Sequence, residues 1–141
     1  MSKLKVLVAD DEPALRKLLK TNMELEGYDT LEASNGKEVL DAVRRENPDI
    51  ILLDIMMPVM DGWEVLTELA ANPEYSSKVI LVSAKASDDA QLQGWELGAD
   101  EYITKPFDLD ALLERVREVA ARTAADTEAR RQQAISELQN L

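Results

Sequence analysis

The chain of 141 residues contains no cysteine and no histidine. Without cysteine it has no disulfide bond and no thiolate metal site, and the redox state of its compartment is left open. Without histidine it lacks imidazole metal ligands, serine–histidine or cysteine–histidine catalysis, and any phosphohistidine of its own. Phosphohistidine chemistry, if it occurs, must therefore come from a partner.

Basic residues and long apolar runs are also scarce. The 16 Lys and Arg residues against 28 Asp and Glu residues give a net charge of −12. So acidic a chain repels phosphates and anionic lipids, which argues against direct binding to nucleic acid or to a membrane. No apolar run approaches the roughly 20 residues of a transmembrane helix. A strand follows Met1 almost at once and leaves no room for a signal peptide, so we expect a cytoplasmic protein.

Strand-like and helix-like patterns alternate five times along the chain. We expect strands over residues 4–9, 28–33, 49–54, 78–83 and 101–104, and helices over residues 13–26, 37–46, 63–71, 87–97 and from 109 onwards. Strands that alternate with helices of this length are typical of βαβ units. The pattern predicts an α/β fold with a parallel sheet.

The last helix is expected to be unusually long. No glycine or proline follows Pro106, and the apolar pattern of 109–120 weakens to alanine and then returns at Ile135, Leu138 and Leu141. We expect one helix of about 30 residues that projects beyond the domain and buries its apolar stripe elsewhere. Residues 1–121 would form the domain, and residues 122–141 a helical extension for dimerisation or for linkage to an effector.

Four of the expected strands end on a residue that can take part in chemistry. Asp10-Asp11, Asp54, Ser83 and Lys105 stand at the ends of the first, third, fourth and fifth strands. In a parallel α/β sheet the binding crevice lies at the carboxyl ends of the strands, so these side chains should meet in one pocket. Each alone also fits a plain role, as a helix cap, a strand-end carboxylate, a turn hydroxyl or a surface lysine. Plain roles at all four strand ends together are improbable.

Three carboxylates in one pocket predict a divalent cation. Two carboxylates about 4 Å apart repel by roughly 4 kcal/mol at an effective dielectric of about 20, so Asp10, Asp11 and Asp54 need a counter-charge. An all-oxygen set with open water positions matches Mg²⁺. Lys105 and the Ser83 hydroxyl are suited to phosphoryl oxygens, which makes Asp54 a candidate nucleophile toward phosphorus.

From residue 4 to about residue 120 the chain closely resembles the receiver domains of bacterial two-component response regulators, which are CheY-like. The resemblance rests on Asp10-Asp11, the stretch LLDIMMPVMDG around Asp54, Ser83-Ala84 and Lys105-Pro106-Phe107. It implies a doubly wound (βα)5 fold with a five-stranded parallel sheet of order 2-1-3-4-5. It also implies a cis Lys105–Pro106 peptide bond.

The resemblance further implies the role of each site residue. Asp54 would accept a phosphoryl group from the phosphohistidine of a sensor histidine kinase or phosphotransfer protein. Asp11, Asp54 and the backbone carbonyl of Met56 would bind Mg²⁺, and Asp10 would help through water. Ser83 and Lys105 would hold the phosphoryl group.

Three more positions gain meaning from the resemblance. Tyr102 stands where the family has its switch aromatic, which turns inward as Ser83 moves, and this remodels the face formed by the fourth helix, the fifth strand and the fifth helix. Met56 and Lys85 occupy two positions that tune the lifetime of the aspartyl phosphate. Neither side chain is a carboxylate or amide that would orient an attacking water, so we expect slow self-dephosphorylation and no catalysis on other substrates.

Other classes of protein share parts of this pattern. A haloacid-dehalogenase-type phosphatase also uses a strand-end aspartate, but it needs an acid at position 56. A flavodoxin-like electron carrier needs a glycine- and hydroxyl-rich loop, whereas this chain has Asp10-Asp11-Glu12-Pro13. A degenerate receiver that acts as a constitutive scaffold is disfavoured by the complete acidic and lysine set.

The sequence leaves open how the domain would pass on its signal. It could act as a single domain that docks on a partner, it could form a homodimer, or it could be the front part of a longer receiver–effector chain. Arg115 and Asp100 match two positions through which winged-helix regulators of the family pair. Gln91 and Gln93 stand where basic residues would be expected, so that dimer is not expected. We expect instead a homodimer whose contacts run along the C-terminal helix.

Overall fold

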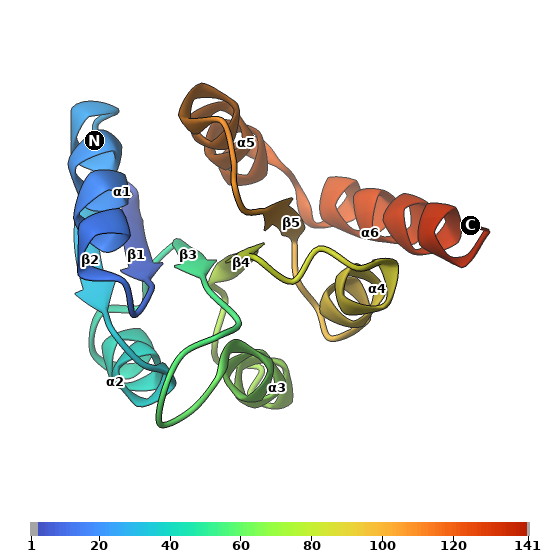
Figure 1. Cartoon of the computed structure of the whole chain (residues 1–141), viewed down its shortest axis with the longest axis horizontal. Helices are drawn as coiled ribbons and strands as arrows, with labels where there is room; N and C mark the ends of the chain where they lie inside the picture. Colours follow the sequence, from blue (N-terminus) through green and yellow to red (C-terminus); the bar gives the residue numbers. More distant parts are fainter. Residues whose placement is uncertain (1–2, 141) are drawn as a thin grey trace.

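The computed structural model describes residues 3–140 and forms one parallel sheet with helices on both faces (Figure 1). In this range the strands number five, in the order β2-β1-β3-β4-β5, and every neighbouring pair is parallel. The strands are β1 (Lys5–Ala9), β2 (Asp29–Ala33), β3 (Ile50–Leu53), β4 (Lys78–Ser83) and β5 (Glu101–Thr104). The predicted fold class and strand order are confirmed.

The helices form two layers, one on each face of the sheet (Figure 1). They are α1 (Pro13–Leu25), α2 (Gly36–Glu46), α3 (Gly62–Ala71), α4 (Asp88–Glu96), α5 (Leu109–Ala121) and α6 (Ala124–Gln139). Helices α1 and α5 cover one face, and α2, α3 and α4 cover the other, with α6 beside α4. Within residues 3–140, every helix is too short or too polar to span a lipid bilayer.

Residues of the central strands alternate between two apolar cores. Val6 and Val8 of β1 lie in the core under α1 and α5, whereas Leu7 and Ala9 lie in the core under α2, α3 and α4. All four side chains are almost wholly buried. Because successive strand residues point to opposite faces, a strand covered on both sides must be apolar throughout, as the sequence of β1 and β3 is.

The prediction of one continuous C-terminal helix is wrong. Helix α5 ends at Ala121, Arg122 adopts an extended backbone with ψ 139°, and α6 begins at Ala124. Thr123 and Asp126 form a capping box, in which each side chain accepts a hydrogen bond from the other residue's backbone N–H. Such a box stabilises a new helix start, and the Thr-x-x-Asp spacing is the sequence signal that the prediction missed.

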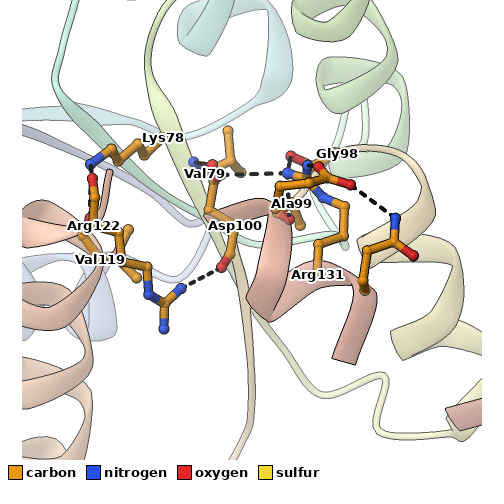
Figure 2. Close-up of polar contacts among 10 residues, drawn as sticks. Lys78, Val79, Gly98, Ala99, Asp100, Val119, Arg122 and Arg131 are labelled. Carbon is orange, nitrogen blue, oxygen red and sulfur yellow. Dashed lines mark hydrogen bonds and ion pairs between the residues drawn. The ribbon is translucent and has the colours of Figure 1, made fainter. Parts of the chain in front are cut away.

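Lys78, the first residue of β4, stabilises the same break by binding the end of α5. Its ammonium donates to the backbone carbonyls of Val119 and Arg122 at 2.9 and 2.8 Å (Figure 2). Carbonyls in the last turn of a helix lack partners within the helix, so a lysine there ends the helix favourably.

Helix α6 folds back onto the domain and does not project from it. It packs mainly against α4, and Ala134 is buried in the core shared with Trp95 and Ala99. Ile135 and Leu138 pack against that core too. Leu141, the last member of the predicted apolar stripe, lies outside the described residues. The predicted stripe therefore exists, but it is covered by the chain's own α4.

Candidate functional site

The acidic residues meet because β1 and β3 are neighbours in register. Ala9 pairs with Leu53, and the backbone N–H of Asp54 donates to the Ala9 carbonyl at 3.0 Å. The next residues, Asp10 and Asp54, are therefore side by side, and both are buried. Asp10, Asp11 and Asp54 each offer a carboxylate oxygen, and these oxygens lie within 4.8 Å of one another.

Lys105 reaches this cluster from the loop that follows β5. Its ammonium lies 2.9 Å from Asp10 Oδ2 and 3.0 Å from Asp54 Oδ2. The Lys105 backbone N–H donates to the Ser83 carbonyl at 2.8 Å, which holds the loop against the end of β4. The predicted cis peptide bond between Lys105 and Pro106 is confirmed.

Burial and pairing shift the pKa values at the site in ways that can be traced. Burial raises the pKa of Asp54, and hydrogen bonds from Lys105 and from the Met56 backbone N–H only partly oppose this rise. Burial alone would lower the pKa of Lys105, but its hydrogen bonds to Asp10 and Asp54 outweigh that effect and raise it. Lys105 is therefore a permanent cation at neutral pH, and it offsets part of the crowded negative charge.

Ser83 and Tyr102 are linked through Lys85. Ser83 is fully buried at the end of β4, and its Oγ accepts a hydrogen bond from the Lys85 backbone N–H at 3.2 Å. The Tyr102 hydroxyl donates to the Lys85 carbonyl. Burial, followed by the charge of Asp54, raises the pKa of Tyr102 to about 12, so the phenol remains a donor.

The donor set fits a hard divalent cation. All the clustered side-chain donors are carboxylate oxygens, which Mg²⁺ prefers, and the exposed carboxylate of Asp11 leaves one side open to water. One oxygen of Asp54 accepts the Met56 backbone N–H at 3.1 Å, so the chain at Met56 turns back over the carboxylate. That the Met56 carbonyl is a ligand stays a prediction, and the Met56 side chain is itself exposed.

Two acidic residues with notable partners, one at the site and one at the far end of β5, were not predicted from the sequence. The carboxylate of Glu12 lies 3.9 Å from the Lys105 ammonium, which makes it an exposed acid at the mouth of the pocket. Glu101, on β5, is 1% exposed and is surrounded by arginines. No motif marks either residue: Glu12 is one more acid after Asp10-Asp11, and a single acid before an aromatic, as in Glu101-Tyr102, is a common pattern in edge strands.

Comparison with known proteins agrees with this geometry. The family model for the response regulator receiver domain matches residues 6–117. The chain is 41% identical over 122 residues to the probable transcriptional regulator ycf27 of Porphyridium aerugineum, and the match covers 86% of this chain and 50% of that protein. The chain therefore spans about half the length of this curated relative.

Solved structures give the same result. The receiver domain of the Francisella response regulator 1452 is 39% identical, with a TM-score of 0.79, and the match covers 84% of this chain and 97% of that one. A CheY-like response regulator receiver domain protein from Methanospirillum hungatei is 31% identical, with a TM-score of 0.78, and the match covers 92% and 99%.

The chain belongs to the response regulator receiver domain family. Its residues Asp10, Asp11, Asp54, Ser83 and Lys105 all lie at the carboxyl edge of the sheet, where the resemblance expected them.

Proposed function

We propose that this chain is a phosphorylation-controlled switch in which Asp54 accepts a phosphoryl group from the phosphohistidine of a sensor kinase or phosphotransfer protein. The observation that carries the proposal is the Lys105 ammonium, which lies 2.9 and 3.0 Å from the carboxylates of Asp10 and Asp54. A cation so close to the acceptor is placed to stabilise the charge of an incoming phosphoryl group.

In the transfer, an Asp54 carboxylate oxygen forms a bond to phosphorus as the phosphorus–nitrogen bond of the phosphohistidine breaks. The partner's imidazole keeps the electron pair and takes up a proton. Positioning and charge neutralisation supply most of the catalysis in such transfers. Lys105 and the Ser83 hydroxyl would hold two phosphoryl oxygens, and the chain would catalyse only its own phosphorylation and slow dephosphorylation.

Mg²⁺ is the expected cofactor, held by Asp11, Asp54 and the Met56 carbonyl, with Asp10 acting through water. When bound, Mg²⁺ would neutralise acidic charge and polarise the phosphoryl group. The chain itself holds the Asp54 carboxylate in place through the hydrogen bond from the Met56 N–H. The burial of Asp10 and Asp54 also limits the access of water to the pocket.

Ser83 and Tyr102 are proposed to transmit the effect of phosphorylation from the site to the surface of the domain. Their shared partner is Lys85, so a movement of the Ser83 hydroxyl toward a phosphoryl group would disturb the hydrogen bond of the Tyr102 phenol. The surface of α4, β5 and α5 would change as a result and act on a partner, on dimerisation or on a downstream effector. The chain itself is proposed to be cytoplasmic and to make no direct contact with nucleic acid or membrane.

A homodimer through residues 122–141 is also proposed, but the position of α6 restricts which of its sides could form the contact. The apolar side of α6 packs on its own domain through Ala134, Ile135 and Leu138. A dimer along that side therefore requires α6 to leave its place, or the two copies must meet through its other side.

The proposal is tested by incubating the chain with Mg²⁺ and acetyl phosphate and measuring the intact mass. We expect one added phosphoryl group on the wild type, and none on Asp54→Asn or when a chelator removes the metal. Sedimentation of the same samples measures the oligomeric state. Equal phosphorylation of the wild type and Asp54→Asn would reject the proposal.

A further inference from the structure

Helix α6 covers the surface formed by the end of α4 and the start of β5, which we call the α4–β5 surface and define by Trp95, Gly98, Ala99, Asp100 and Glu101. In Figure 1, α6 lies beside α4, outside the edge strand β5. The packing is close, since Trp95 is 2% exposed and Ala99 is fully buried.

Glu101 on this surface binds arginines from three places in the chain. Its carboxylate lies 3.2 Å from Arg115 of α5, 2.8 Å from Arg122 at the α5–α6 junction and 3.5 Å from Arg130 of α6. The Glu101 side chain is only 1% exposed. A buried carboxylate is costly without partners, and guanidinium groups suit it because each presents several donors in a fixed plane. Two of the three arginines come from the segment that begins after α5.

Arg131 binds the end of α4 directly. Its guanidinium donates to the carbonyls of Gly98 and Ala99, both at 3.2 Å, and lies 3.5 Å from Asp100 (Figure 2). Carbonyls that follow a helix C-terminus lack helical partners and carry the negative end of the helix dipole, so a cation is favoured there. The next arginine, Arg130, lies 5.0 Å from the centre of the Trp95 ring, which is cation–π geometry.

A chain of contacts joins this surface to the phosphoryl site. Tyr102, whose hydroxyl is bonded to Lys85, has its ring against Gly94 of α4, where an added Cβ would lie 3.0 Å from the ring. Gly94 is followed by Trp95, on which Arg130 rests. A shift of the Tyr102 ring thus has to disturb α4 at the point where α6 is bound.

We propose that α6 is an intramolecular ligand of the α4–β5 surface, held there by its arginines, and that phosphorylation of Asp54 releases it. While α6 is docked, it would block the binding of other proteins to this surface, and phosphorylation of Asp54 would end the block. The docking follows from the contacts alone, whereas the release rests on the proposed function. The two parts are therefore measured separately.

The docking is tested by hydrogen exchange and mass spectrometry on the whole chain in Mg²⁺. We expect Arg130→Gln to speed amide exchange in residues 124–139 by about tenfold or more, which corresponds to about 1.4 kcal/mol of docking free energy. Exchange in β1 and β3 should not change. Arg117→Gln is the matched control, because Arg117 of α5 pairs with Glu26, away from α6. Glu101→Gln should act like Arg130→Gln if it folds.

Equal exchange of α6 in Arg130→Gln and Arg117→Gln would overturn the docking. So would rapid exchange of α6 in the unmodified wild type, because a docked helix protects its amides.

The release is tested on the wild type and on Asp54→Asn, each with Mg²⁺ and acetyl phosphate, with the intact mass read on the same samples. We expect faster α6 exchange in the phosphorylated wild type and no change in Asp54→Asn. Phosphorylated chain with α6 still protected would overturn the release but leave Asp54 as acceptor. If no phosphoryl group is taken up, the proposed function fails and the release fails with it, while the Arg130→Gln comparison still decides the docking.

Discussion

At the scale of single residues, Lys105 is the group on which the acidic pocket depends. One ammonium lies within 3.0 Å of two buried carboxylates that come from different strands. Burial raises the pKa of Asp54, the hydrogen bond from Lys105 opposes that rise, and only an ionised carboxylate would attack phosphorus. Under the proposed function, Lys105 would therefore help to keep Asp54 ionised, and its ammonium would be close enough to bind a phosphoryl group on Asp54.

Met56 and Lys85 are the residues that should set the lifetime of the phosphorylated state. Both line one hollow beside the site, together with Ile55, Asp61 and Trp63. Because neither side chain can orient a water for attack, we expect slow loss of the phosphoryl group. Met56→Asn should speed it by about tenfold or more, since a positioned polar group assists proton transfer. Intact mass against time measures this, with Met56→Leu as the control. Loss from the wild type within seconds, without a phosphatase, would contradict it.

Val59 has a strained backbone in the loop that follows the site. Its φ is +69°, and the Met60 N–H donates to the Pro58 carbonyl across it at 2.7 Å, which makes a tight three-residue turn. A β-branched residue with positive φ costs about 1–2 kcal/mol, whereas asparagine tolerates that conformation.

Val59→Asn should therefore raise the free energy of unfolding by about 1 kcal/mol, as measured by urea denaturation. Val59 is 78% exposed, so little packing is lost. Leu25→Asn, at an equally exposed position in α1, is the control and should give no gain. An unchanged or lower stability in Val59→Asn would show that the strain is absent.

At the scale of elements, the break between α5 and α6 decides where the C-terminal segment goes. A continuous helix would carry Ile135 and Leu138 away from the domain, whereas the break returns them to α4. The hydrogen bonds from Lys78 of β4 to the end of α5 and the capping box at Thr123 both favour the break. The rest of the segment has good helix formers, so helix propensity alone does not favour the bent form over the straight one.

Thr123→Ala should weaken the bent form. It removes the side chain that accepts the Asp126 N–H, and losing such a cap costs about 1 kcal/mol. We expect a larger radius of gyration in X-ray scattering and faster amide exchange in α6. Asn35→Ala, which removes the corresponding cap of α2, is the control and should leave both unchanged. An unaltered radius of gyration and unaltered exchange in Thr123→Ala would mean that the cap does not hold α6 in place.

At the scale of the whole molecule, the proposed chemistry and the proposed output lie toward opposite ends of β5, because Lys105 follows the end of that strand and Glu101 begins it. The acidic pocket lies at the carboxyl edge of the sheet, and the α4–β5 surface lies near the start of β5. Between β5 and α5, a hollow of about 290 Å³ lined by Tyr102, Phe107 and Arg115 is open. Helix α6 thus covers one part of the face that the switch would remodel and leaves another part accessible.

The fold was predictable from the sequence because its signals are local and repeated. Buried strands such as β3 are apolar throughout, and the turns carry glycine or proline. The acidic site was predictable because parallel strands bring their carboxyl ends to one edge, which makes Asp10, Asp54 and Lys105 neighbours. The docking of α6 was not predictable in the same way. It depends on Glu101 and Arg130, whose contact is set by tertiary packing and leaves no periodic pattern.

The central claim is that Asp54 is the phosphoacceptor, and the most direct measurement is to locate the modified residue. Borohydride reduction of an aspartyl phosphate gives homoserine, which tandem mass spectrometry can place in the sequence after reaction with Mg²⁺ and acetyl phosphate. We expect homoserine at position 54 and nowhere else. Homoserine at position 10 or 11, or at no position while the chain carries phosphate, would contradict it.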